Sequence, residues 1–471
     1  MNLVEAMTDE TLFEPWFRGA SWNAWRTVLK ATCALPLDDD ERHVFRALAE
    51  RDPPTIKARE LWIVAGRRAG KDSIASLIGG YYAAVPDYLP FLRPGETAMV
   101  MCLAVDRLQA RIVLNYTRSF YDRIPLLSSL KSGSERRDGF DLCNGVELSV
   151  GVTNFRSVRG RPIPCAIFDE VAFWRDIDSA SPDVEIYQAV VPGMATMPEA
   201  ILVGISSPYR RSGLLWDKFK AHFGKDGDVL VIKAPSLALN PTLNPRIVAE
   251  ALERDPAAAA AEWLAEFRTD IDTFVAREVV DAAVVAGRHE LPRRSGVSYF
   301  GFVDPSGGSV DSMTLAIAHR DENEGVLDAV REWRPPFSPE AVVSEAADLL
   351  KSYGVHEVTG DRYAGEWPRE RFRNCGITYQ PSERTKSDIY REFLPLVNGG
   401  RVQLLDNPRL IAQLCGLERR VARGGKDSID HGPGAHDDVC NSSAGALVNV
   451  VGEMSELDVW KKLGERSFVA A

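Results

Sequence analysis

The sequence predicts two α/β domains joined by a helical segment, and three observations support this fold class. In the first half of the chain, short continuous apolar runs alternate with helical stretches, a pattern typical of strands buried in a parallel-rich sheet. Between Pro235 and Pro292 the pattern becomes helical. From Ser298, three strand-like runs follow one another closely and alternating helices and strands come after them, which indicates a second α/β domain.

The composition excludes several classes of protein. The chain has 471 residues, of which 45% are hydrophobic and 26% charged, so it can form a large core and is not of disordered composition. Its formal net charge of −11 argues against a generic polybasic coat for nucleic acid but is compatible with a local basic channel.

The cysteines and the N-terminal segment indicate the compartment. The seven cysteines are dispersed and form no CxxC pair, so neither a disulfide framework nor a zinc ribbon is expected. The segment MNLVEAMTDE has no basic stretch followed by an apolar core, and no run reaches the roughly 18 apolar residues of a membrane span. We therefore expect an intracellular protein in a reducing compartment, with no membrane association.

The first half of the chain is expected to begin with helices and then to form a sheet. Residues 1–59 are rich in aromatic and acidic side chains and are expected to form an N-terminal helical lid. Residues 60–235 are assigned to the first α/β core. Its strands are expected at residues 61–66, 98–105, 165–170, 200–208 and 229–235.

Residues 236–295 are expected to form a helical linker, because PAAAAAEWLAEFR places Pro256 in the first turn of a run of strong helix formers. The second α/β domain is assigned to residues 296–450, and a C-terminal tail to residues 451–471. Its strands are expected in SYFGFVD, MTLAIAHR, GVLDAVREW, HEVTGD, ITYQPSE and VQLL, and its last helix from about His436.

A glycine-rich segment, LWIVAGRRAGKDS, joins the first strand to the next helix. Its Gly66, Gly70 and Lys71 form a near match to a P-loop, with Ala65 at the usual first glycine. In such loops, backbone N–H groups and the helix N-terminus bind phosphate oxygens, and the lysine reaches the β and γ phosphates. The segment therefore predicts a nucleotide site, although a near match taken alone also fits a tight turn.

Four neighbours of Lys71 are further candidates for this nucleotide site. Arg67 and Arg68 lie within the loop, where guanidinium groups neutralise charge on a transferred phosphoryl group. Asp72 stands where a Ser or Thr hydroxyl normally contacts Mg²⁺, and Ser73 comes one position later. The sequence therefore leaves the magnesium contact at this position open.

A pair of acids strengthens the nucleotide-site prediction. CAIFDEVAFW places Asp169 and Glu170 at the end of an apolar strand, where the first acid binds Mg²⁺ and the second orients the attacking water. Two solvent-facing acids are the alternative, but the Gly-Lys loop upstream favours ATP hydrolysis. Ser206, Ser207 and Pro208 close the next strand and are candidates for sensing the γ-phosphate, although SSP is also common in turns.

The second domain carries dispersed aspartates. Asp304 ends its first strand, Asp361 ends its fourth, and Asp437 with Asp438 stands where its last helix begins. In a ribonuclease H-like topology these places converge, so their carboxylates can bind two Mg²⁺ or Mn²⁺ ions that activate water and stabilise the leaving oxygen of a phosphodiester. Each acid alone also fits a structural turn.

In their order along the chain, these motifs resemble the large terminase subunit of tailed bacteriophages and related prophage elements, the motor and nuclease of DNA packaging. The resemblance extends from about Trp22 to Val450. It implies an ASCE-type P-loop ATPase joined to a ribonuclease H-like endonuclease. It rests on the motifs SWNAW, GRRAGK, IFDEVAFW, SSP, EWLAEF, DPSGG, GDRYAG and HDD.

The resemblance implies roles for the ATPase candidates. Lys71, with Arg68 or Arg67, would bind phosphate, and Asp169 and Glu170 would be the paired acids of ATP hydrolysis.

For the nuclease, the resemblance implies a triad of Asp304, Asp361 and Asp438, with Asp437 as the alternative third member. Arginines are further candidates, either as an arginine acting on a neighbouring subunit or as contacts to DNA and nucleotide, and solvated surface positions are their alternative. They are Arg107, Arg111, Arg159, Arg210, Arg211, Arg369, Arg371, Arg373, Arg419, Arg420 and Arg423, with Lys426.

The resemblance also implies cofactors, partners and location. ATP and Mg²⁺ would be the cofactors, with Mn²⁺ substituting in the nuclease site. Double-stranded DNA, a portal protein and a small terminase subunit would be the partners of a homo-oligomeric ring, in the cytoplasm of the infected bacterial host and transiently on the prohead portal vertex. The alternative functions are a helicase-nuclease of repair or recombination and a nucleotide-binding structural adaptor without nuclease activity.

Overall fold

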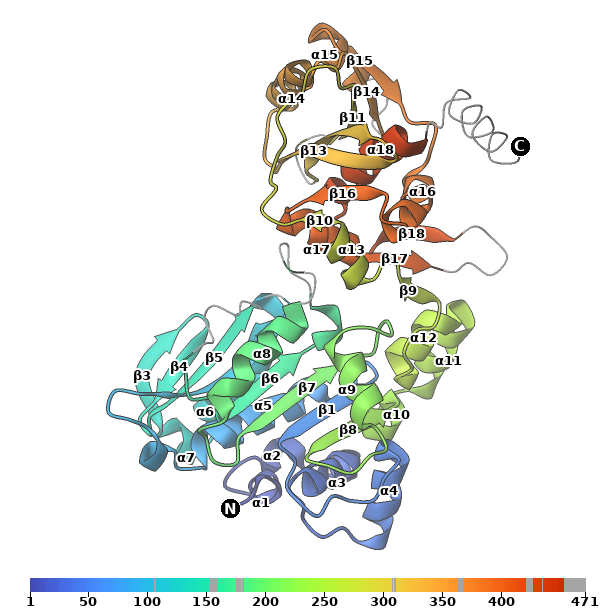
Figure 1. Cartoon of the computed structure of the whole chain (residues 1–471). Helices are drawn as coiled ribbons and strands as arrows, with labels where there is room; N and C mark the ends of the chain where they lie inside the picture. Colours follow the sequence, from blue (N-terminus) through green and yellow to red (C-terminus); the bar gives the residue numbers. More distant parts are fainter. Residues whose placement is uncertain are drawn as a thin grey trace, which may run out of the picture. The chain divides into compact units, whose positions relative to one another are not determined.

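The structure is a computed structural model of the whole chain (Figure 1). It describes residues 1–105, 107–152, 160–174, 179, 182–306, 308, 311–361, 367–420, 427–433 and 435–452. The chain divides into two compact units, Met1–Asp176 with Ser181–Asp270, and Ile177–Ala180 with Ile271–Ala471.

The first unit is built around an eight-stranded sheet with the order β3-β4-β5-β2-β6-β7-β1-β8. The strands from β5 to β8 in this order run parallel, and β3 and β4 add an antiparallel hairpin. The bounds are β1 Glu60–Ala65, β2 Ala98–Ala104, β3 Lys131–Arg136, β4 Gly139–Leu142, β5 Val146–Val152, β6 Cys165–Asp169, β7 Ile201–Ser206 and β8 Val229–Ala234.

Helices cover both faces of this sheet, which is why β1, β2, β6, β7 and β8 are largely apolar. In β1, Leu61 and Ile63 face a core formed with the N-terminal helices, α5 and α6. The alternate residues Trp62 and Val64 face a second core formed with α8 and α9 (Figure 1). The bounds are α1 Leu3–Thr8, α2 Glu14–Phe17, α3 Asn23–Thr32, α4 Asp39–Ala49, α5 Lys71–Ala84, α6 Arg107–Arg123, α7 Pro125–Ser128, α8 Pro182–Met194, α9 Leu214–His222, α10 Ser236–Leu239, α11 Pro245–Arg254 and α12 Pro256–Leu264.

The second unit contains a seven-stranded sheet with the order β10-β16-β13-β12-β11-β14-β15. β11, β12 and β13 form an antiparallel meander, and β14 and β15 continue parallel to β11. A small sheet with the order β18-β17-β9 accompanies it. The bounds are β9 Ile271–Thr273, β10 Val284–Val285, β11 Tyr299–Asp304, β12 Met313–Asp321, β13 Glu324–Trp333, β14 Glu357–Gly360, β15 Thr378–Pro381, β16 Val402–Leu405, β17 Leu417–Arg420 and β18 Ser428–His431.

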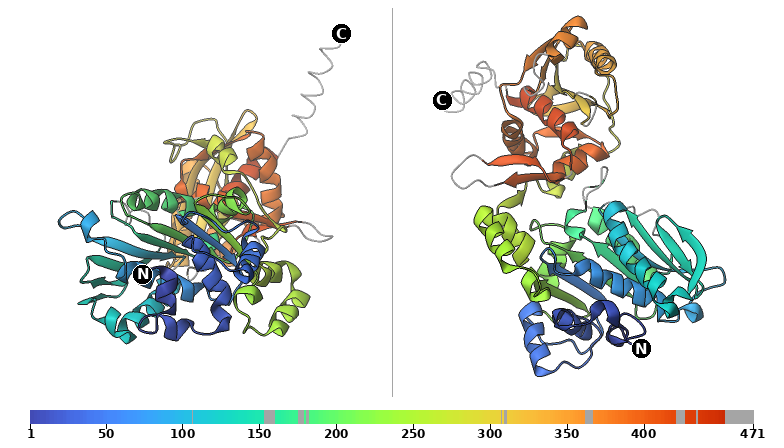
Figure 2. Two further views of the ribbon diagram at one scale, coloured as in Figure 1. Left: turned by 90° about the horizontal axis from the view of Figure 1, so that it is seen from below. Right: turned by 180° about the vertical axis from the view of Figure 1, so that it is seen from behind.

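The helices of the second unit also lie on both faces of its large sheet. α13, α16, α17 and α18 share one core, and α14 and α15 share the other (Figures 1 and 2). Phe302 of β11 contributes to the α18 side and Val303 to the α14 side. The bounds are α13 Arg277–Ala283, α14 Pro339–Tyr353, α15 Trp367–Asn374, α16 Lys386–Asn398, α17 Pro408–Gly416 and α18 Asp438–Gly452.

These topologies confirm the predicted fold class. β7 lies between β1, which precedes the glycine-rich loop, and β6, which ends in the paired acids; this is the strand order of an ASCE-type P-loop fold. The order β13-β12-β11-β14-β15, with β12 antiparallel to its neighbours, is the ribonuclease H-like order. Every predicted strand is present, and β3, β4, β5, β9, β10, β17 and β18 were not predicted.

The expected lid belongs to the first unit, and the expected linker is divided between the two units. The lid residues contain α1 to α4 and contribute Trp25 to the core of the first unit. Of residues 236–295, α10 to α12 belong to the first unit, and β9, α13 and β10 belong to the second. Among the described helices, none combines the length and hydropathy of a membrane-spanning segment.

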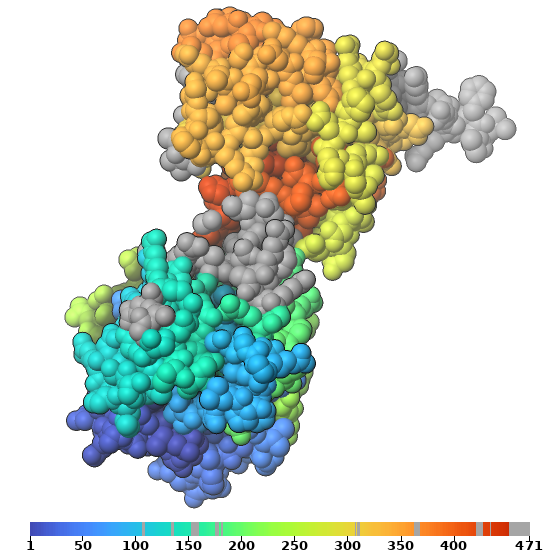
Figure 3. Space-filling model, turned by 90° about the vertical axis from the view of Figure 1, so that its left-hand side faces the viewer, coloured from blue at the N-terminus to red at the C-terminus, as the bar shows by residue number. Residues whose placement is uncertain are grey.

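The surface of the first unit includes the strands that sequence reasoning missed. Residues of β3 to β5 form part of the face seen in Figure 3. Some candidates lie outside the described residues: Arg159, Arg423, Lys426, residues 362–365 of GDRYAG and residues 453–471 of the tail.

Candidate functional site

The loop between β1 and α5 has a backbone that few residues other than glycine can form. Gly70 has a φ of +89° and Arg68 a φ of +61°. A Cβ atom at Gly66 would lie 2.2 Å from the Ser236 Oγ and 2.7 Å from the Trp263 carbonyl oxygen. The loop ends at the N-terminus of a 14-residue helix with no side-chain cap, so the first N–H groups of α5 are available to an anion.

Side chains around the loop hold its carbonyl groups. The Trp25 indole N–H donates to the Ala69 carbonyl at 2.8 Å. The Ser236 hydroxyl donates to the Arg67 carbonyl at 2.7 Å, and the Asn240 amide donates to the Arg68 carbonyl at 2.8 Å. Three consecutive peptide groups are therefore fixed before any ligand binds, which lowers the ordering cost of binding.

Lys71 lies at the carboxyl ends of three strands. Its side chain is only 5% exposed, and its Nζ donates to the Ala65 carbonyl at 3.2 Å and to the Ser207 hydroxyl at 2.9 Å. The same Nζ lies 3.2 Å from the Glu170 Oε1. The parallel order β6-β7-β1 brings these groups together, because carboxyl ends of neighbouring parallel strands share one edge of the sheet.

Glu170 is held in a fixed orientation after β6. Its φ is +48°, an uncommon value for a residue other than glycine. Its Oε2 accepts hydrogen bonds from the Ser206 hydroxyl at 3.0 Å and from the Ser207 N–H at 3.1 Å. The SSP segment therefore contacts the acid pair directly, which is a connection between β6 and β7 at the predicted site.

Asp169 is a buried carboxylate that fits a metal ion. Burial, with the nearby charges of Glu170 and Asp72, raises its pKa to about 8, and Lys71 partly opposes this shift. Its Oδ1 is buried and has no hydrogen-bond partner among the described residues. An unpartnered buried carboxylate oxygen beside a phosphate-type loop is the donor that Mg²⁺ of a bound nucleotide requires.

The remaining loop candidates lie at different depths. Asp72 is half-buried in the first turn of α5, where burial raises its pKa, Lys71 lowers it and Glu170 raises it further. Ser73, in the same turn, is also half-buried. Arg67 and Arg68 are exposed, and the Arg67 guanidinium lies 3.3 Å from the Glu262 carboxylate. The structure therefore brings Lys71, Asp72 and the acid pair together and leaves both arginines at the surface.

The raised pKa of Asp169 predicts a pH effect on stability. Between about pH 4 and pH 8 the folded chain keeps a proton that the unfolded chain loses, so the free energy of unfolding decreases as the pH rises, by up to about 1.4 kcal/mol per pH unit. The isosteric Asp169→Asn chain lacks this titration. In metal-free urea unfolding, we expect Asp169→Asn to gain stability over the wild type from pH 5 to pH 8; an advantage independent of pH would contradict the burial of an ionisable Asp169.

In the second unit, the sheet places Asp304 beside Asp361. Asp304 ends β11, Val303 pairs with Gly360 of β14, and the Asp361 N–H donates to the Val303 carbonyl at 3.2 Å. Burial raises the pKa of Asp304 well above its usual value, Asn441 lowers it through a hydrogen bond, and the charges of Asp438 and Asp361 raise it further. A cluster of carboxylates that disfavours its own ionisation is a site that a divalent cation stabilises.

The start of α18 places Asp438 beside the same strands. Thr314, which pairs with Asp304 across β11 and β12, donates its hydroxyl to the Asp438 carbonyl at 2.7 Å. The Gln413 side chain accepts a hydrogen bond from the Cys440 N–H at 2.9 Å and so caps the helix. Burial and the Asp437 charge raise the pKa of Asp438 to about 6, and its buried Oδ2 has no hydrogen-bond partner among the described residues.

Asp437 has different partners from Asp438. Its Oδ2 lies 3.0 Å from the Lys386 Nζ and accepts a hydrogen bond from the Tyr390 hydroxyl at 3.0 Å. Within the described residues, Asp430, His431 and Asp437 form the group whose ligand atoms all lie within 4.8 Å of one another. The Lys386 ammonium, also 2.7 Å from Asp430, already neutralises these acids.

The predicted triad is therefore assembled in part. The charges of Asp361 and Asp438 raise the pKa of Asp304. The three are nevertheless not among the groups, in the described part of the chain, whose ligand atoms all lie within 4.8 Å of one another, as those of Asp430, His431 and Asp437 do. Sequence reasoning missed the residues that organise the site, which are Thr314, Lys386, Tyr390, Gln413 and Asn441. Of these residues, only Asn441 could have been found from the sequence, because it follows Asp438 by three positions and therefore lies on the same face of the helix.

Several candidate arginines have acidic neighbours. Arg111 lies 3.7 Å from Asp138, and Arg371 lies 2.6 Å from Glu340. Arg419 pairs with Asp427. The predicted basic clusters thus consist partly of ion-paired side chains, which weakens the prediction that they form a continuous basic channel.

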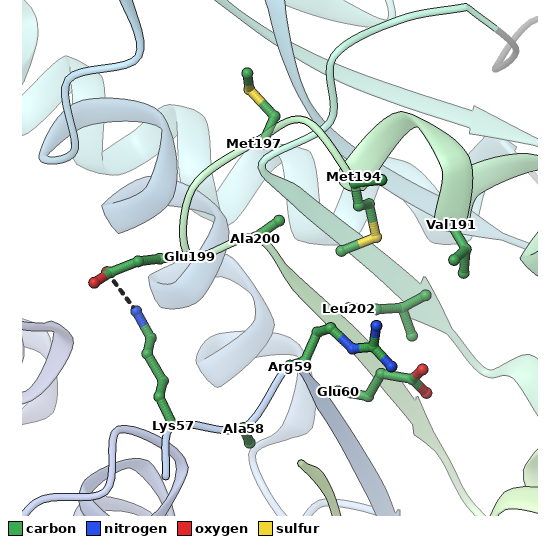
Figure 4. Close-up of a pocket in the computed structure, with 11 residues that line it drawn as sticks. Lys57, Ala58, Arg59, Glu60, Val191, Met194, Met197, Glu199, Ala200 and Leu202 are labelled. Carbon is green, nitrogen blue, oxygen red and sulfur yellow. Dashed lines mark hydrogen bonds and ion pairs between the residues drawn. The ribbon is translucent and has the colours of Figure 1, made fainter. Parts of the chain in front are cut away.

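The first unit also contains a cavity of about 530 Å³, which neither Lys71 nor the acid pair lines (Figure 4). It opens at the amino ends of β1 and β7, where Ala58, Met194, Met197 and Leu202 contribute apolar surface. The Lys57 ammonium and the Glu199 carboxylate form an ion pair at 2.7 Å beside it. Since the glycine-rich loop follows the carboxyl end of β1, this cavity is not part of the predicted nucleotide site.

No protein-family model matches the chain, and no curated protein sequence matches it. The structure is similar to that of the HK97 bacteriophage large terminase, with 17% identity over 88% of this chain and 95% of that chain and a TM-score of 0.39. The large terminase of a thermophilic bacteriophage matches at 11% identity over 92% of this chain and 100% of its own, with a TM-score of 0.39.

A third similar structure covers only part of the chain. The large terminase nuclease from thermophilic phage G20c with bound magnesium matches at 18% identity over 36% of this chain and 94% of its own, with a TM-score of 0.32. These values describe distant likenesses.

Proposed function

We propose that the chain is a DNA-packaging motor of the large terminase type, in which ATP hydrolysis drives double-stranded DNA into a prohead and a two-metal endonuclease cuts concatemeric DNA. The observation that carries the proposal is the presence, in one chain, of a lysine–acid-pair site on an ASCE-type sheet and an aspartate site on a ribonuclease H-like sheet. The motor and the nuclease thus reside in different units of the chain.

In the ATPase unit, each side chain has a distinct task. Lys71 exchanges its contacts with Glu170 and the Ala65 carbonyl for the β and γ phosphates, as the lysine of a P-loop does. Glu170, released from this ion pair but still held by Ser207, orients the attacking water. Asp169, whose buried Oδ1 has no hydrogen-bond partner among the described residues, would hold Mg²⁺ as a carboxylate, and the ion would supply charge neutralisation for the transferred phosphoryl group.

Breaking the Lys71–Glu170 ion pair couples nucleotide binding to movement of β7. The Ser206 hydroxyl and the Ser207 N–H both donate hydrogen bonds to Glu170. A movement of the Glu170 carboxylate therefore displaces the end of β7 and the segment that leads to α9. We propose this segment as the element that transmits hydrolysis to DNA translocation.

In the nuclease unit, Asp304, Asp361 and Asp438 are the proposed ligands of two Mg²⁺ or Mn²⁺ ions. Such ions supply an activated water and stabilise the leaving oxygen in phosphodiester cleavage. Asp304 lies at the end of β11, Asp361 directly follows the adjacent strand β14, and Asp438 lies in the first turn of α18. Lys386 and Tyr390 hold Asp437 away from this role.

The two neighbouring aspartates are predicted to differ under mutation. Asp438→Asn should lower Mn²⁺-dependent cleavage by at least about 100-fold, because it removes a proposed metal ligand. Asp437→Asn should leave most cleavage intact and lower the melting temperature, because it removes one of the two carboxylates that pair with the half-buried Lys386 ammonium. Plasmid nicking and thermal melting of both variants check this assignment, and the opposite pattern would make Asp437 the third ligand.

The proposed partners follow from the same function. They are double-stranded DNA, a portal protein, a small terminase subunit and further copies of this chain in a ring, in the cytoplasm of an infected bacterium and at the portal vertex. A helicase-nuclease would need a second motor lobe, whereas the described residues between the two sheets form short helices and two short strands. A structural adaptor would not need the buried acids of both sites.

The test is packaging of linear DNA into purified proheads by the purified chain and ATP, scored as DNA protected from added nuclease. We expect protection that depends on ATP and on Lys71. Protection without ATP would overturn the motor assignment, and ATP-dependent strand separation instead of packaging would favour the helicase-nuclease.

A further inference from the structure

One buried amide contacts a proposed metal ligand, and the function proposed above assigns it no task of its own. Asn441 of α18 is fully buried, and its Nδ2 donates a hydrogen bond to the Asp304 Oδ2 at 2.7 Å. Asparagine is rarely buried without a partner, because an unsatisfied amide is costly to desolvate. The position therefore requires an explanation in terms of Asp304.

The packing of α18 on β11 explains why these two side chains meet. Asp304 and Phe302 are two residues apart and so project from the same face of β11. Asn441 and Gly445 are four residues apart and so lie on one face of α18. A Cβ atom at Gly445 would come within 2.5 Å of the Phe302 ring, so the glycine allows α18 to pack closely against β11. This close packing places Asn441 opposite Asp304.

The same helix face carries Asp438, one turn before Asn441. The Asn441 N–H donates to the Asp437 carbonyl at 2.8 Å, which starts the helical hydrogen bonding. Among the described residues, the Asn441 Oδ1 and the Asp438 Oδ2 are both buried without a hydrogen-bond partner. Two unpartnered acceptor oxygens beside Asp304 fit a site that holds a cation better than a purely structural polar contact.

We propose that Asn441 is a positioning residue of the nuclease metal site, which fixes the Asp304 carboxylate so that its other oxygen faces Asp361 and Asp438. This inference rests on the proposed nuclease function. Asn441 gives Asp304 one directed donor in a place where the charged groups that act on Asp304 are carboxylates, and so selects one orientation of the ligand before the ions bind. Partners of this kind typically change metal affinity by about 10- to 100-fold.

The test compares Mn²⁺ binding to the full-length chain by isothermal titration calorimetry. The heat that disappears in Asp304→Asn defines binding at the nuclease site. We expect Asn441→Leu, which keeps the volume and removes the donor, to bind Mn²⁺ there about 10- to 100-fold more weakly. The Mn²⁺ concentration for half-maximal plasmid nicking should rise by a similar factor, while the rate at saturating Mn²⁺ falls less.

Ser443→Ala is the matched control. Ser443 is also buried on α18, and its hydroxyl donates to the Val439 carbonyl, so its removal should leave Mn²⁺ affinity unchanged. Melting in EDTA and retained ATP hydrolysis show that each variant is folded. If Asn441→Leu does not fold, Asn441→Ser replaces it, because the smaller side chain leaves room for a water molecule and also removes the amide donor.

The outcomes separate the inference from the function on which it rests. Wild-type Mn²⁺ affinity in folded Asn441→Leu or Asn441→Ser, alongside Asp304-dependent binding and cleavage in the wild type, would overturn the positioning role alone. A wild-type chain that shows neither Asp304-dependent binding nor cleavage would overturn the proposed nuclease and the inference together.

Discussion

Replacing Lys71 with alanine is expected to lower ATP turnover by about 10²- to 10³-fold, the effect of removing one charge-stabilising group from a preorganised site. The side chain is almost completely buried at the point where three strand ends meet, so no neighbouring lysine can replace it. Steady-state phosphate release by the purified chain measures the effect. Mn²⁺-dependent plasmid nicking should persist, because the proposed nuclease ligands belong to the other unit.

Lys57→Ala is the control for this variant. Lys57 belongs to the same unit and also forms an ion pair with a glutamate, but it lies at the amino end of β1, far along the strand from the phosphate-type loop. We expect wild-type ATP turnover from it. If ATP hydrolysis survived in Lys71→Ala and depended on no other residue of the loop, the loop would not be the site of ATP hydrolysis.

Replacing Asp304 with asparagine is expected to reduce Mn²⁺-dependent cleavage by at least about 10³-fold, because a carboxylate that would hold the metal ions is lost. The metal-free variant should nevertheless melt at the wild-type temperature or above it. Burial and the neighbouring acids raise the pKa of Asp304, so the ionised form destabilises the metal-free fold and a neutral isostere relieves that cost.

Asp348→Asn on α14 is the matched control for Asp304→Asn. Asp348 is an exposed aspartate of the same unit, and its loss should change neither cleavage nor melting. Full cleavage by Asp304→Asn would exclude the aspartate site as the nuclease, and a sharp fall in metal-free stability would contradict the electrostatic description of it.

The parts of the fold that the sequence predicts are those in which burial determines residue type. β1, β2, β6, β7 and β8 are buried on both faces and therefore appear as uninterrupted apolar runs. The segment from Lys131 to Val152 forms β3, β4 and β5 on one side of the sheet, where buried residues of β5 alternate with half-buried ones. Its mixture of glycine, serine and charged residues does not have the pattern of a buried strand, so these strands were not predicted. The strands β17 and β18 were not predicted for the same reason.

The candidate sites show a similar division. Lys71, Asp169 and Glu170 could be placed from the sequence because a strand end and a helix start fix each of them locally. The choice between Asp437 and Asp438 could not be made, because the two differ only in which side of a helix start they face, and that depends on Lys386, about 50 residues earlier. Asn441 was missed because its partner, Asp304, is 137 positions away.

The most direct test of two phosphate-handling sites in one chain is anomalous diffraction from crystals grown with Mn²⁺ and a non-hydrolysable ATP analogue. We expect manganese peaks beside Asp169, with the triphosphate over the loop at Lys71, and among Asp304, Asp361 and Asp438. Manganese bound instead by Asp430, His431 and Asp437, with Lys386 displaced, would contradict this expectation.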